Sequence, residues 1–299
     1  MSIPKIASYV APEPSAWPQS RVNWRIDASR AVLLIHDMQD YFVNFFDRAA
    51  PPVPQLLQRI ADLRQACREA GVPVVYTAQP GEQALADRAL LQDWWGPGIT
   101  AQPSQSGVVA PLLPADAEQV LAKWRYSAFA KSELQSQMRD QRRDQLIVCG
   151  VYAHIGVMTT CVDAFMRDIQ PFLVADAVAD FSRDEHLMAL SWVAGRCGVV
   201  TGTAEVCQAL KPAAASHHAS LQALLAEVAQ LLEVPDSDLH VEDNLIDMGL
   251  DSIRLMSLVT RWRKLGLPVT FGQLAEQPSI QAWWDMLYPH TKASAPGGA

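Results

Sequence analysis

Short apolar runs alternate with helical patterns over the first part of the chain. Six runs have the length and composition of buried strands: Ala31–Ile35, Val72–Thr77, Gln119–Ala122, Leu146–Cys149, Pro171–Ala175 and Gly198–Thr201. Between them, apolar residues recur three or four positions apart, which predicts amphipathic helices over Pro54–Ala70, Ser132–Arg142 and Ser182–Arg196. Alternating strands and helices predict an α/β fold, with a parallel sheet of about six strands flanked by helices.

The pattern changes near residue 205. We assign 1–204 to the first domain and 205–216 to a linker, because periodicity is lost and the chain runs into PAAASHH. Residues 217–290 show helical patterns on both sides of one acidic loop, which predicts a four-helix bundle. The expected helices are Ser220–Leu232, Asp251–Leu265, Phe271–Glu276 and Ser279–Leu287. We expect the tail, 291–299, to be disordered.

The composition is that of a globular protein, with 49% hydrophobic and 19% charged residues. No apolar run approaches the roughly 20 residues of a membrane helix, and the N-terminus lacks the pattern of a signal peptide. The five cysteines are odd in number and irregularly spaced, which disfavours a disulfide framework. We therefore expect a protein of the cytoplasm without a membrane partner.

The net charge of −8 is concentrated in the second domain. Residues 217–290 carry four basic and ten acidic side chains, a net charge of −6. Such a balance argues against nucleic acid as a partner. A small acidic domain suits docking onto basic protein surfaces.

Four residues fall just beyond predicted strand ends: Asp37, Gln79, Lys123 and Gly156. Because the carboxyl ends of parallel strands share one edge of the sheet, we expect these positions to form a site. Gly156 stands in the turn between a strand and a helix and presents no side chain. Neighbouring strand ends must therefore supply the chemistry.

Asp37 and Lys123 are the candidate catalytic residues. Asp37 follows a buried strand and precedes Tyr41 and Phe42, and a carboxyl group in apolar surroundings retains its proton to higher pH, as a general acid requires. The alternative for Asp37 is a helix cap. Lys123 lies in the cationic, aromatic stretch LAKWRYSAF, and its alternative is a surface lysine packed over Trp124.

Gln79 and Arg88 are candidates for substrate binding. The forked guanidinium of Arg88 suits a substrate carboxylate, whereas the alternative is an ordinary surface arginine on a helix. We interpret His36 and His154 as packed residues. With neither a His-x-x-x-His motif nor clustered cysteine and histidine residues, we expect no metal site.

The motifs IHDMQDYF, YTAQP, KWRYSAF, GVYAHIG and VADFSRDEH resemble the isochorismatase branch of the isochorismatase-like hydrolases, from about Ile3 to Thr201. In the wider superfamily, as in nicotinamidases, an Asp, a Lys and a Cys form a catalytic triad. The matching positions here are Asp37, Lys123 and Gly156, so the nucleophile is missing. Cys161 lies more than a helical turn further on, and the histidine pair that binds metal in nicotinamidases is also missing.

This departure suits cleavage of a vinyl ether, which needs a proton donor and no covalent intermediate. The resemblance implies that isochorismate is hydrolysed to 2,3-dihydro-2,3-dihydroxybenzoate and pyruvate. It implies that Asp37 is the acid and that Gly156 leaves room for the substrate ring. The substrate-binding residues that it implies are Phe42, Gln79, Arg88, Lys123 and Tyr152.

A second motif, DNLIDMGLDS, ends at Ser252. Gly249 ends a loop, Asp251 can cap the following helix, and the Ser252 hydroxyl is left at the helix N-terminus. A phosphodiester attached there would meet free N–H groups and the positive end of the helix dipole. The alternative is a plain serine at a helix start. The whole string resembles a phosphopantetheinyl carrier domain.

Together, the two halves resemble the bifunctional isochorismatase/aryl carrier proteins of catecholate siderophore synthesis. This implies covalent 4'-phosphopantetheine on Ser252, which carries 2,3-dihydroxybenzoate as a thioester. The implied partners are a phosphopantetheinyl transferase, a 2,3-dihydroxybenzoate-AMP ligase and a nonribosomal peptide synthetase condensation domain, with a homodimer or larger assembly through the hydrolase half. Two alternatives stay open: a carrier scaffold with an inactive hydrolase domain, and a cysteine-type amidohydrolase, which Gly156 disfavours.

Overall fold

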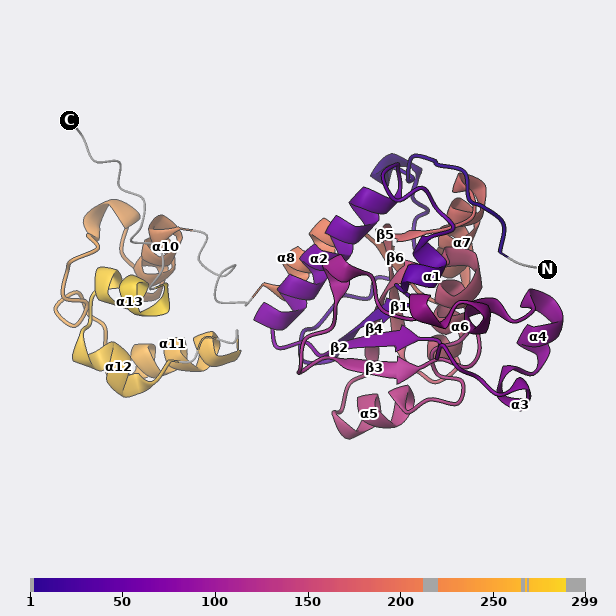
Figure 1. The fold of residues 1–299 in the computed structure, drawn as a ribbon. Helices are drawn as coiled ribbons and strands as arrows, with labels where there is room; N and C mark the ends of the chain where they lie inside the picture. The colour runs from indigo at the N-terminus through magenta and orange to yellow at the C-terminus, as the bar shows by residue number, and fades with distance from the viewer. Residues whose placement is uncertain (1–2, 212–219, 265–266, 268, 289–299) are drawn as a thin grey trace, which may run out of the picture. The chain divides into compact units, whose positions relative to one another are not determined.

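The computed structural model describes residues 3–211, 220–264, 267 and 269–288. The chain divides into two compact units, Met1–Leu210 and Lys211–Ala299 (Figure 1). The first unit contains the sheet and the second is helical. Each unit has hydrophobic core clusters of its own.

Six parallel strands form the sheet, in the order β3-β2-β1-β4-β5-β6. Their bounds are Ala31–His36 (β1), Val74–Ala78 (β2), Gln119–Ala122 (β3), Gln145–Val151 (β4), Gln170–Ala179 (β5) and Val199–Thr201 (β6). The predicted fold class is confirmed. The chain runs outward from β1 to β3 and then crosses to β4, so the strand order reverses between β1 and β4, where open α/β sheets bind ligands.

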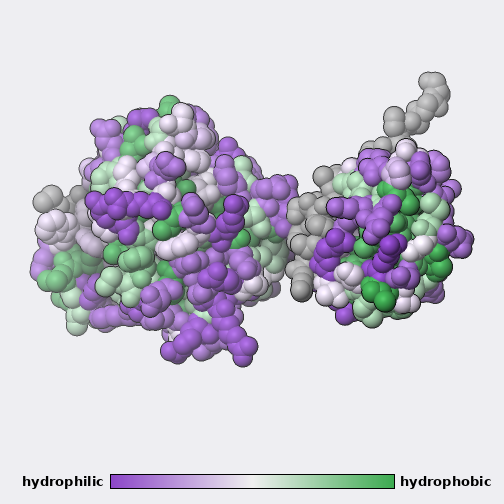
Figure 2. Space-filling view, turned by 180° about the vertical axis from the view of Figure 1, so that it is seen from behind, coloured by the Kyte–Doolittle hydropathy of each residue, from purple (hydrophilic) through white to green (hydrophobic). Residues whose placement is uncertain are grey.

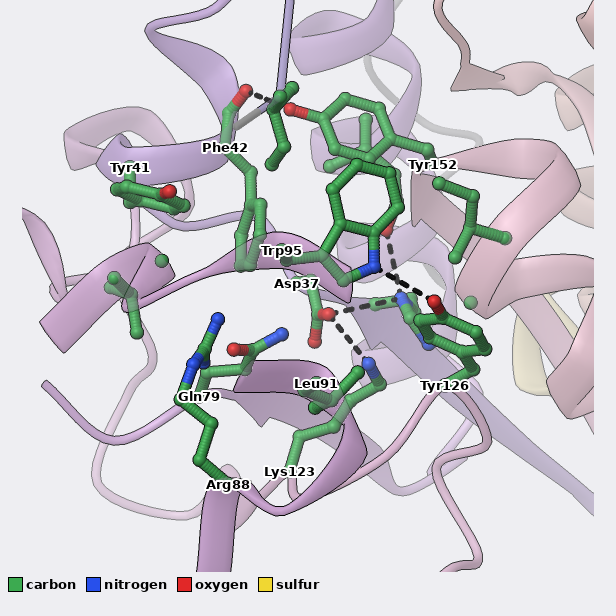
Figure 3. A pocket seen from close by; sticks show the side chains of 17 residues that line it. Asp37, Tyr41, Phe42, Gln79, Arg88, Leu91, Trp95, Lys123, Tyr126 and Tyr152 are labelled. Atoms are coloured by element: carbon green, nitrogen blue, oxygen red, sulfur yellow. Dashed lines mark hydrogen bonds and ion pairs between the residues drawn. The ribbon is translucent and has the colours of Figure 1, made fainter. Parts of the chain in front are cut away.

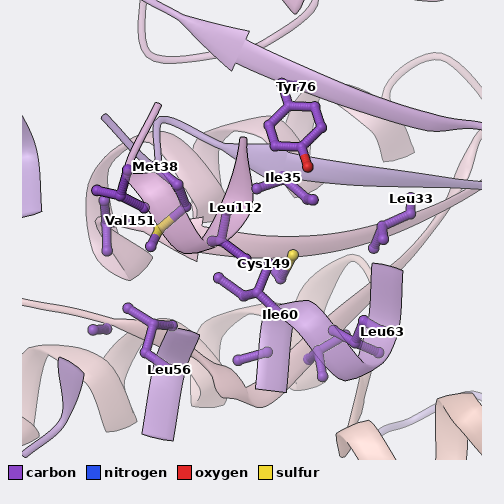
Figure 4. Packing of buried hydrophobic residues seen from close by; sticks show 14 of the residues in the cluster. Leu33, Ile35, Met38, Leu56, Ile60, Leu63, Tyr76, Leu112, Cys149 and Val151 are labelled. Carbon is purple, nitrogen blue, oxygen red and sulfur yellow. The ribbon is translucent and has the colours of Figure 1, made fainter. Parts of the chain in front are cut away.

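Two layers of helices cover the sheet (Figure 1). Helices α2 (Val53–Glu69) and α8 (Thr203–Leu210) contribute to the core on one face, and α5 (Leu134–Asp140), α6 (Met158–Phe165) and α7 (Arg183–Arg196) to the core on the other. Helix α2 buries Leu56, Ile60 and Leu63, one helical turn apart, against strand residues (Figure 4). The i, i+4 pattern that predicted this helix is therefore the pattern that packs it.

The remaining helices of the first unit are short. They are α1 (Asp40–Val43), α3 (Leu85–Arg88) and α4 (Leu90–Trp95), with a π-helical turn, η5 (Ala153–Val157), between β4 and α6, and 3-10 turns at Pro14–Ala16, Gly98–Ala101, Pro103–Gln105 and Ala110–Leu112. Helices α3 and α4 are separated at Ala89, whose φ is 47°. The Ser182 side chain accepts from the Glu185 N–H and caps the start of α7.

The linker begins later in the chain than the sequence analysis predicted. Residues 205–210 belong to α8, which buries Val206 and Leu210 in the core cluster that includes residues of α2. Two apolar contacts a turn apart are enough to dock this short helix, and so weak a pattern was missed in the sequence. Linker residues 212–216 and the tail 291–299 lie outside the described residues.

In the second unit, the helices are α10 (Leu221–Leu232), α11 (Ser252–Lys264), α12 (Phe271–Glu276) and α13 (Ile280–Leu287), with a 3-10 turn, η6 (Asp236–Asp238). The rings of Trp262 and Trp283 meet edge to face in its core, with centroids 5.8 Å apart. On the face seen in Figure 2, hydrophobic residues lie among hydrophilic ones on both units. None of the helices described here has both the length and the apolar character required to cross a membrane.

Candidate functional site

A pocket with about 550 Å³ of empty space, partly open to solvent, lies at the carboxyl ends of the strands, where the strand order reverses. We call it the switch-point pocket (Figure 3). Residues from β1, β2, β3 and β4, or directly after them, meet here although they are far apart in the sequence. All seven hydrolase positions singled out in the sequence line it: Asp37, Phe42, Gln79, Arg88, Lys123, Tyr152 and Gly156.

The Asp37 carboxylate is held from two sides. Lys123 Nζ lies 2.8 Å from Asp37 Oδ2, and the Thr77 hydroxyl donates to Oδ1 at 2.7 Å. Lys123 is only 3% exposed, so the alternative of a surface lysine is wrong. Asp37 is 4% exposed, and the N-cap of the next helix, α1, is Gln39 without a side-chain cap bond, so the alternative of a helix cap is also wrong. A buried ion pair of this kind keeps both groups fixed and close to the substrate space.

The backbone of Asp37 adopts a positive φ of 49° directly after β1. Its N–H donates to the Thr77 carbonyl at 3.2 Å. Residues other than glycine rarely take this conformation, which costs of the order of 1 kcal/mol and collects at functional sites. Asp and Asn tolerate it better than most residues, so the position is suited to the side chain that it carries.

Arg88 is a buried cation whose guanidinium has free donor capacity. The side chain is 4% exposed, so the surface-arginine alternative is wrong. Its Nε donates to the Gly96 carbonyl at 2.6 Å, whereas Nη1 is buried without a hydrogen-bond partner, and no carboxylate of the described residues pairs with it. Burial lowers the pKa of Arg88. Such a group favours an anionic ligand, because burying an unpaired charge is costly.

Gln79 stands beside Arg88 in the pocket (Figure 3). Its backbone is fixed by the fully buried Gln39, whose Oε1 accepts from the Gln79 N–H at 2.7 Å and whose Nε2 donates to the Gln79 carbonyl at 2.9 Å. This pair of bonds orients the strand end that presents the Gln79 side chain. Gln39 was not singled out in the sequence, although it belongs to the IHDMQDYF motif.

Gly156 lines the pocket and also packs against a second side chain. A Cβ at this position would lie 2.2 Å from His36 Cε1, so the side of Gly156 on which a Cβ would project is filled by the His36 imidazole. His36 is fully buried, as expected of a packed residue. Its Nδ1 donates to the Val151 carbonyl at 2.9 Å, and burial lowers its pKa to about 4, so the ring is neutral at pH 7.

Aromatic side chains form much of the remaining wall. The Tyr152 hydroxyl donates to the Phe42 carbonyl at 2.7 Å, so its proton is already committed within the protein. The sequence interpretation missed Trp95 and Tyr126, which also line the pocket and are joined by a bond from the Trp95 indole N–H to the Tyr126 hydroxyl at 2.8 Å.

His154, Asp180 and Glu185 form a group outside the predicted set. Asp180 accepts from the His154 backbone N–H at 2.6 Å and from the Phe181 N–H at 2.9 Å, and its Oδ1 lies 2.5 Å from His154 Nδ1. Glu185 accepts from the Ser182 hydroxyl at the start of α7. These bonds account for the group as local structure, and we assign no metal to it.

Ser252 is the first residue of α11 and is exposed. Asp251 Oδ1 accepts from the N–H groups of Ile253 and Arg254 at 2.9 and 2.8 Å, so the predicted helix cap is confirmed. Gly249 ends the preceding loop with a φ of 98°. Beside the serine lies a groove whose apolar lining residues include Ile246, Leu250, Leu255 and Phe271.

The model of the isochorismatase domain matches residues 31–205. The chain belongs to the isochorismatase family. A second model, of the phosphopantetheine attachment site, matches residues 222–287 and so includes Ser252. The resemblances stated from the hydrolase motifs and from the DNLIDMGLDS string are both confirmed.

Similarity to curated proteins extends over both units. The chain is 51% identical to enterobactin synthase component B of Escherichia coli, over 98% of this chain and 100% of that protein. It is 44% identical to an isochorismatase of Bacillus subtilis, over 99% and 98% of the two chains. Among solved structures, a cysteine hydrolase from Pseudomonas syringae is similar, with a TM-score of 0.59 and 25% identity over 65% of this chain and 97% of that one.

In this member of the family no cysteine of the described residues lines the switch-point pocket. Cys161 is fully buried on α6, and burial raises the pKa of its thiol well above the ordinary value. Because the thiolate is the nucleophilic form, Cys161 is unsuited to replace a nucleophile at position 156.

Proposed function

We propose that the switch-point pocket hydrolyses the vinyl ether of isochorismate to 2,3-dihydro-2,3-dihydroxybenzoate and pyruvate by acid catalysis. The observation that carries this proposal is the buried Asp37–Lys123 pair, which lies in one pocket with Arg88 and its buried, unpartnered Nη1. No thiol is found among the described residues of that pocket. The 51% identity to enterobactin synthase component B supports the same substrate and a place in siderophore synthesis.

The charges of the pocket match those of the substrate. Isochorismate carries two carboxylates, and Arg88 and Lys123 are the cations among the described pocket residues. The free guanidinium N–H groups of Arg88 bind one carboxylate, and Gln79 beside it supplies an amide for a carboxylate or hydroxyl. The rings of Phe42, Tyr152 and Trp95 cover the apolar parts of the substrate.

The reaction needs one proton transfer to carbon. The ion pair of Asp37 with Lys123 is the deprotonated form of the acid, and the reacting form of Asp37 is protonated. It gives its proton to the terminal methylene carbon of the enolpyruvyl group, which creates an oxocarbenium ion. The carboxylate left behind is stabilised by the contacts described above, from Lys123 Nζ and the Thr77 hydroxyl. Water adds to the cation, and the hemiketal collapses to pyruvate and the ring alcohol while the released proton returns to Asp37.

The direct test is incubation of the full chain with isochorismate while pyruvate release is followed. Rapid release supports the proposal. A chain that loads the carrier arm but releases no pyruvate would be the scaffold with an inactive hydrolase domain. Hydrolysis of nicotinamide in place of isochorismate would identify a cysteine-type amidohydrolase, although glycine at position 156 supplies no nucleophile.

Removing the charge of Arg88 is expected to weaken substrate binding. Arg88→Gln should raise KM for isochorismate about 10- to 100-fold, since hydrogen bonds to charged groups contribute about 1.5–3 kcal/mol. The matched control is Arg139→Gln, whose side chain is 77% exposed. The measurement is the initial rate of pyruvate release against isochorismate concentration, and an unchanged KM in Arg88→Gln would contradict the assignment.

Gly156→Cys is expected to impair the protein without creating an amidase. The new Cβ would displace the His36 ring, so stability should fall by about 1–3 kcal/mol and kcat at least tenfold. The matched control is Gly195→Ala in α7, where a Cβ meets nothing within 4 Å and stability should rise slightly. Denaturant unfolding, pyruvate release and nicotinamide hydrolysis measure the three effects; robust nicotinamidase activity would show the pocket to be misassigned.

For the second unit we propose that Ser252 carries 4'-phosphopantetheine and, on it, 2,3-dihydroxybenzoate as a thioester. The exposed serine, its capped helix and the match to the attachment-site model support this role. The proposed partners are a phosphopantetheinyl transferase, a 2,3-dihydroxybenzoate-AMP ligase and a condensation domain. Ile253 and Met256, which are 81% and 52% exposed on α11, together with Phe271 on α12, offer these partners an apolar surface next to the arm.

Two further proposals concern the surroundings of the chain. We propose a homodimer or larger assembly through the hydrolase unit, which exposes large apolar side chains such as Met166 and Trp192. We also propose a reducing compartment, the cytoplasm, because Cys67, Cys149, Cys161 and Cys197 are free thiols.

A further inference from the structure

The segment before β1, residues 3–30, reaches the switch-point pocket although it precedes the matched isochorismatase domain, which begins at residue 31. We call this segment the N-terminal arm. Its Ile3 lines the pocket together with Asp37 and Arg88. We propose that the arm completes the substrate pocket and that Ile3 is a specificity-determining residue, whose apolar side chain sets the affinity for isochorismate. This inference rests on the proposed hydrolase function.

The arm is fixed close to the pocket by its backbone and by one core residue. Ile6 is 4% exposed and packs in the core cluster that includes Tyr41 and Phe42, two residues of the pocket wall. The Ile6 N–H donates to the Phe45 carbonyl at 2.8 Å. Three extended residues span at most about 11 Å, so an anchored Ile6 keeps Ile3 near the pocket.

A second anchor is the Tyr9 hydroxyl, whose hydrogen bonds determine one another. Buried His186 has Nε2 at 3.0 Å from the Ala175 carbonyl, which can only accept, so Nε2 carries the proton. Burial lowers the pKa of His186, which leaves Nδ1 as an acceptor. The Tyr9 hydroxyl therefore donates to Nδ1 at 3.2 Å and accepts from the Asp180 N–H at 2.8 Å.

Asp180 also supports the turn that contributes another part of the pocket lining. Its carboxylate accepts from the backbone N–H of His154, in turn η5. That turn brings Ile155 and Gly156 into the pocket. The arm and the turn are therefore both hydrogen-bonded to Asp180, the arm to its backbone N–H and the turn to its carboxylate, and a displaced arm would disturb the pocket at both places.

Ile3 should act on binding and not on the chemical step. Its side chain carries neither a charge nor an acidic proton, so it can neither bind a carboxylate nor protonate carbon; other residues supply those groups. Shortening it removes only apolar contact with the substrate, and a lost methyl or methylene in such a pocket changes affinity about tenfold or more.

The experiment uses the full chain with four single substitutions, and one pair for the binding measurement. Ile3→Ala should raise KM for isochorismate about tenfold and leave kcat within about twofold. Ile3→Leu, of similar volume, should restore KM to within about threefold of the original. Val10→Ala is the matched control in the same arm, because Val10 is 66% exposed. Tyr9→Phe keeps the ring, removes the hydroxyl bonds of the anchor and should raise KM about threefold or more.

Binding is measured separately from chemistry by calorimetry in the Asp37→Asn background. The Kd of isochorismate for Ile3→Ala/Asp37→Asn should exceed that of Asp37→Asn by the same factor as KM. An Ile3→Ala variant with native melting temperature, and with KM and Kd both within twofold of the unsubstituted chains, would overturn the proposal. A fall in kcat alone would also overturn it. Absence of pyruvate release from the unsubstituted chain would instead refute the proposed function.

Discussion

Asp37→Asn is expected to lower kcat for pyruvate release at least about 100-fold, the usual scale for losing a general acid, while KM stays within about threefold. The amide cannot supply the proton that the methylene carbon requires. Its carbonyl oxygen can still accept from Lys123 or Thr77, and Asn tolerates the positive φ of 49° at this position. The fold should therefore be kept, and steady-state kinetics at saturating isochorismate measure the loss.

The matched control for this change is Asp168→Asn. Asp168 also has a positive φ, of 59°, but it is exposed and does not line the pocket. The control should keep the kcat of the unsubstituted chain, so any shared effect of replacing Asp by Asn in left-handed backbone cancels. If Asp37→Asn turned over isochorismate at the original kcat, Asp37 would not be the proton donor.

Ser252→Ala is expected to abolish attachment of the phosphopantetheine arm completely. The attachment is a phosphodiester to the serine hydroxyl, and alanine has no oxygen to form it. Incubation with coenzyme A and a phosphopantetheinyl transferase should add the mass of the arm to the original chain and nothing to the variant, as intact-protein mass spectrometry would show. Pyruvate release should be unchanged, since the hydrolase unit has its own cores and pocket.

Ser257→Ala is the matched control, because Ser257 is a second exposed serine on α11. This variant should accept the arm as the original chain does. A mass gain in Ser252→Ala would place the arm on another residue. Loss of pyruvate release in Ser252→Ala would show that the two activities depend on one another.

The sequence predicted the sheet well because buried parallel strands are short apolar runs with clear ends. Strand Gln119–Ala122 has the predicted bounds, and the other five differ by a few residues at their ends. The convergence of Asp37, Gln79 and Lys123 followed from one rule of parallel sheets, that their carboxyl ends share an edge. Helix α8 was missed because a short helix docked by two apolar contacts has little periodicity.

The details of the pocket were less predictable, because they depend on contacts between distant segments. The burial of Arg88 arises from the path of α3 and α4, and neither helix has a strong pattern. The bond from the Tyr152 hydroxyl to the Phe42 carbonyl joins residues 110 positions apart. Likewise, the contact between Gly156 and the His36 ring joins two distant segments, so the sequence pattern does not reveal it.

The contact between His36 and Gly156 also bears on how activities diverge within this fold. A cysteine at position 156 must displace the imidazole from the adjoining space, and a smaller residue at position 36 would open a void beside Asp37 as long as position 156 is glycine. Each single step is therefore unfavourable, whereas the pair of changes compensates. The two positions should be epistatic, and an evolutionary path between proton-driven ether cleavage and thiol chemistry must pass through both together.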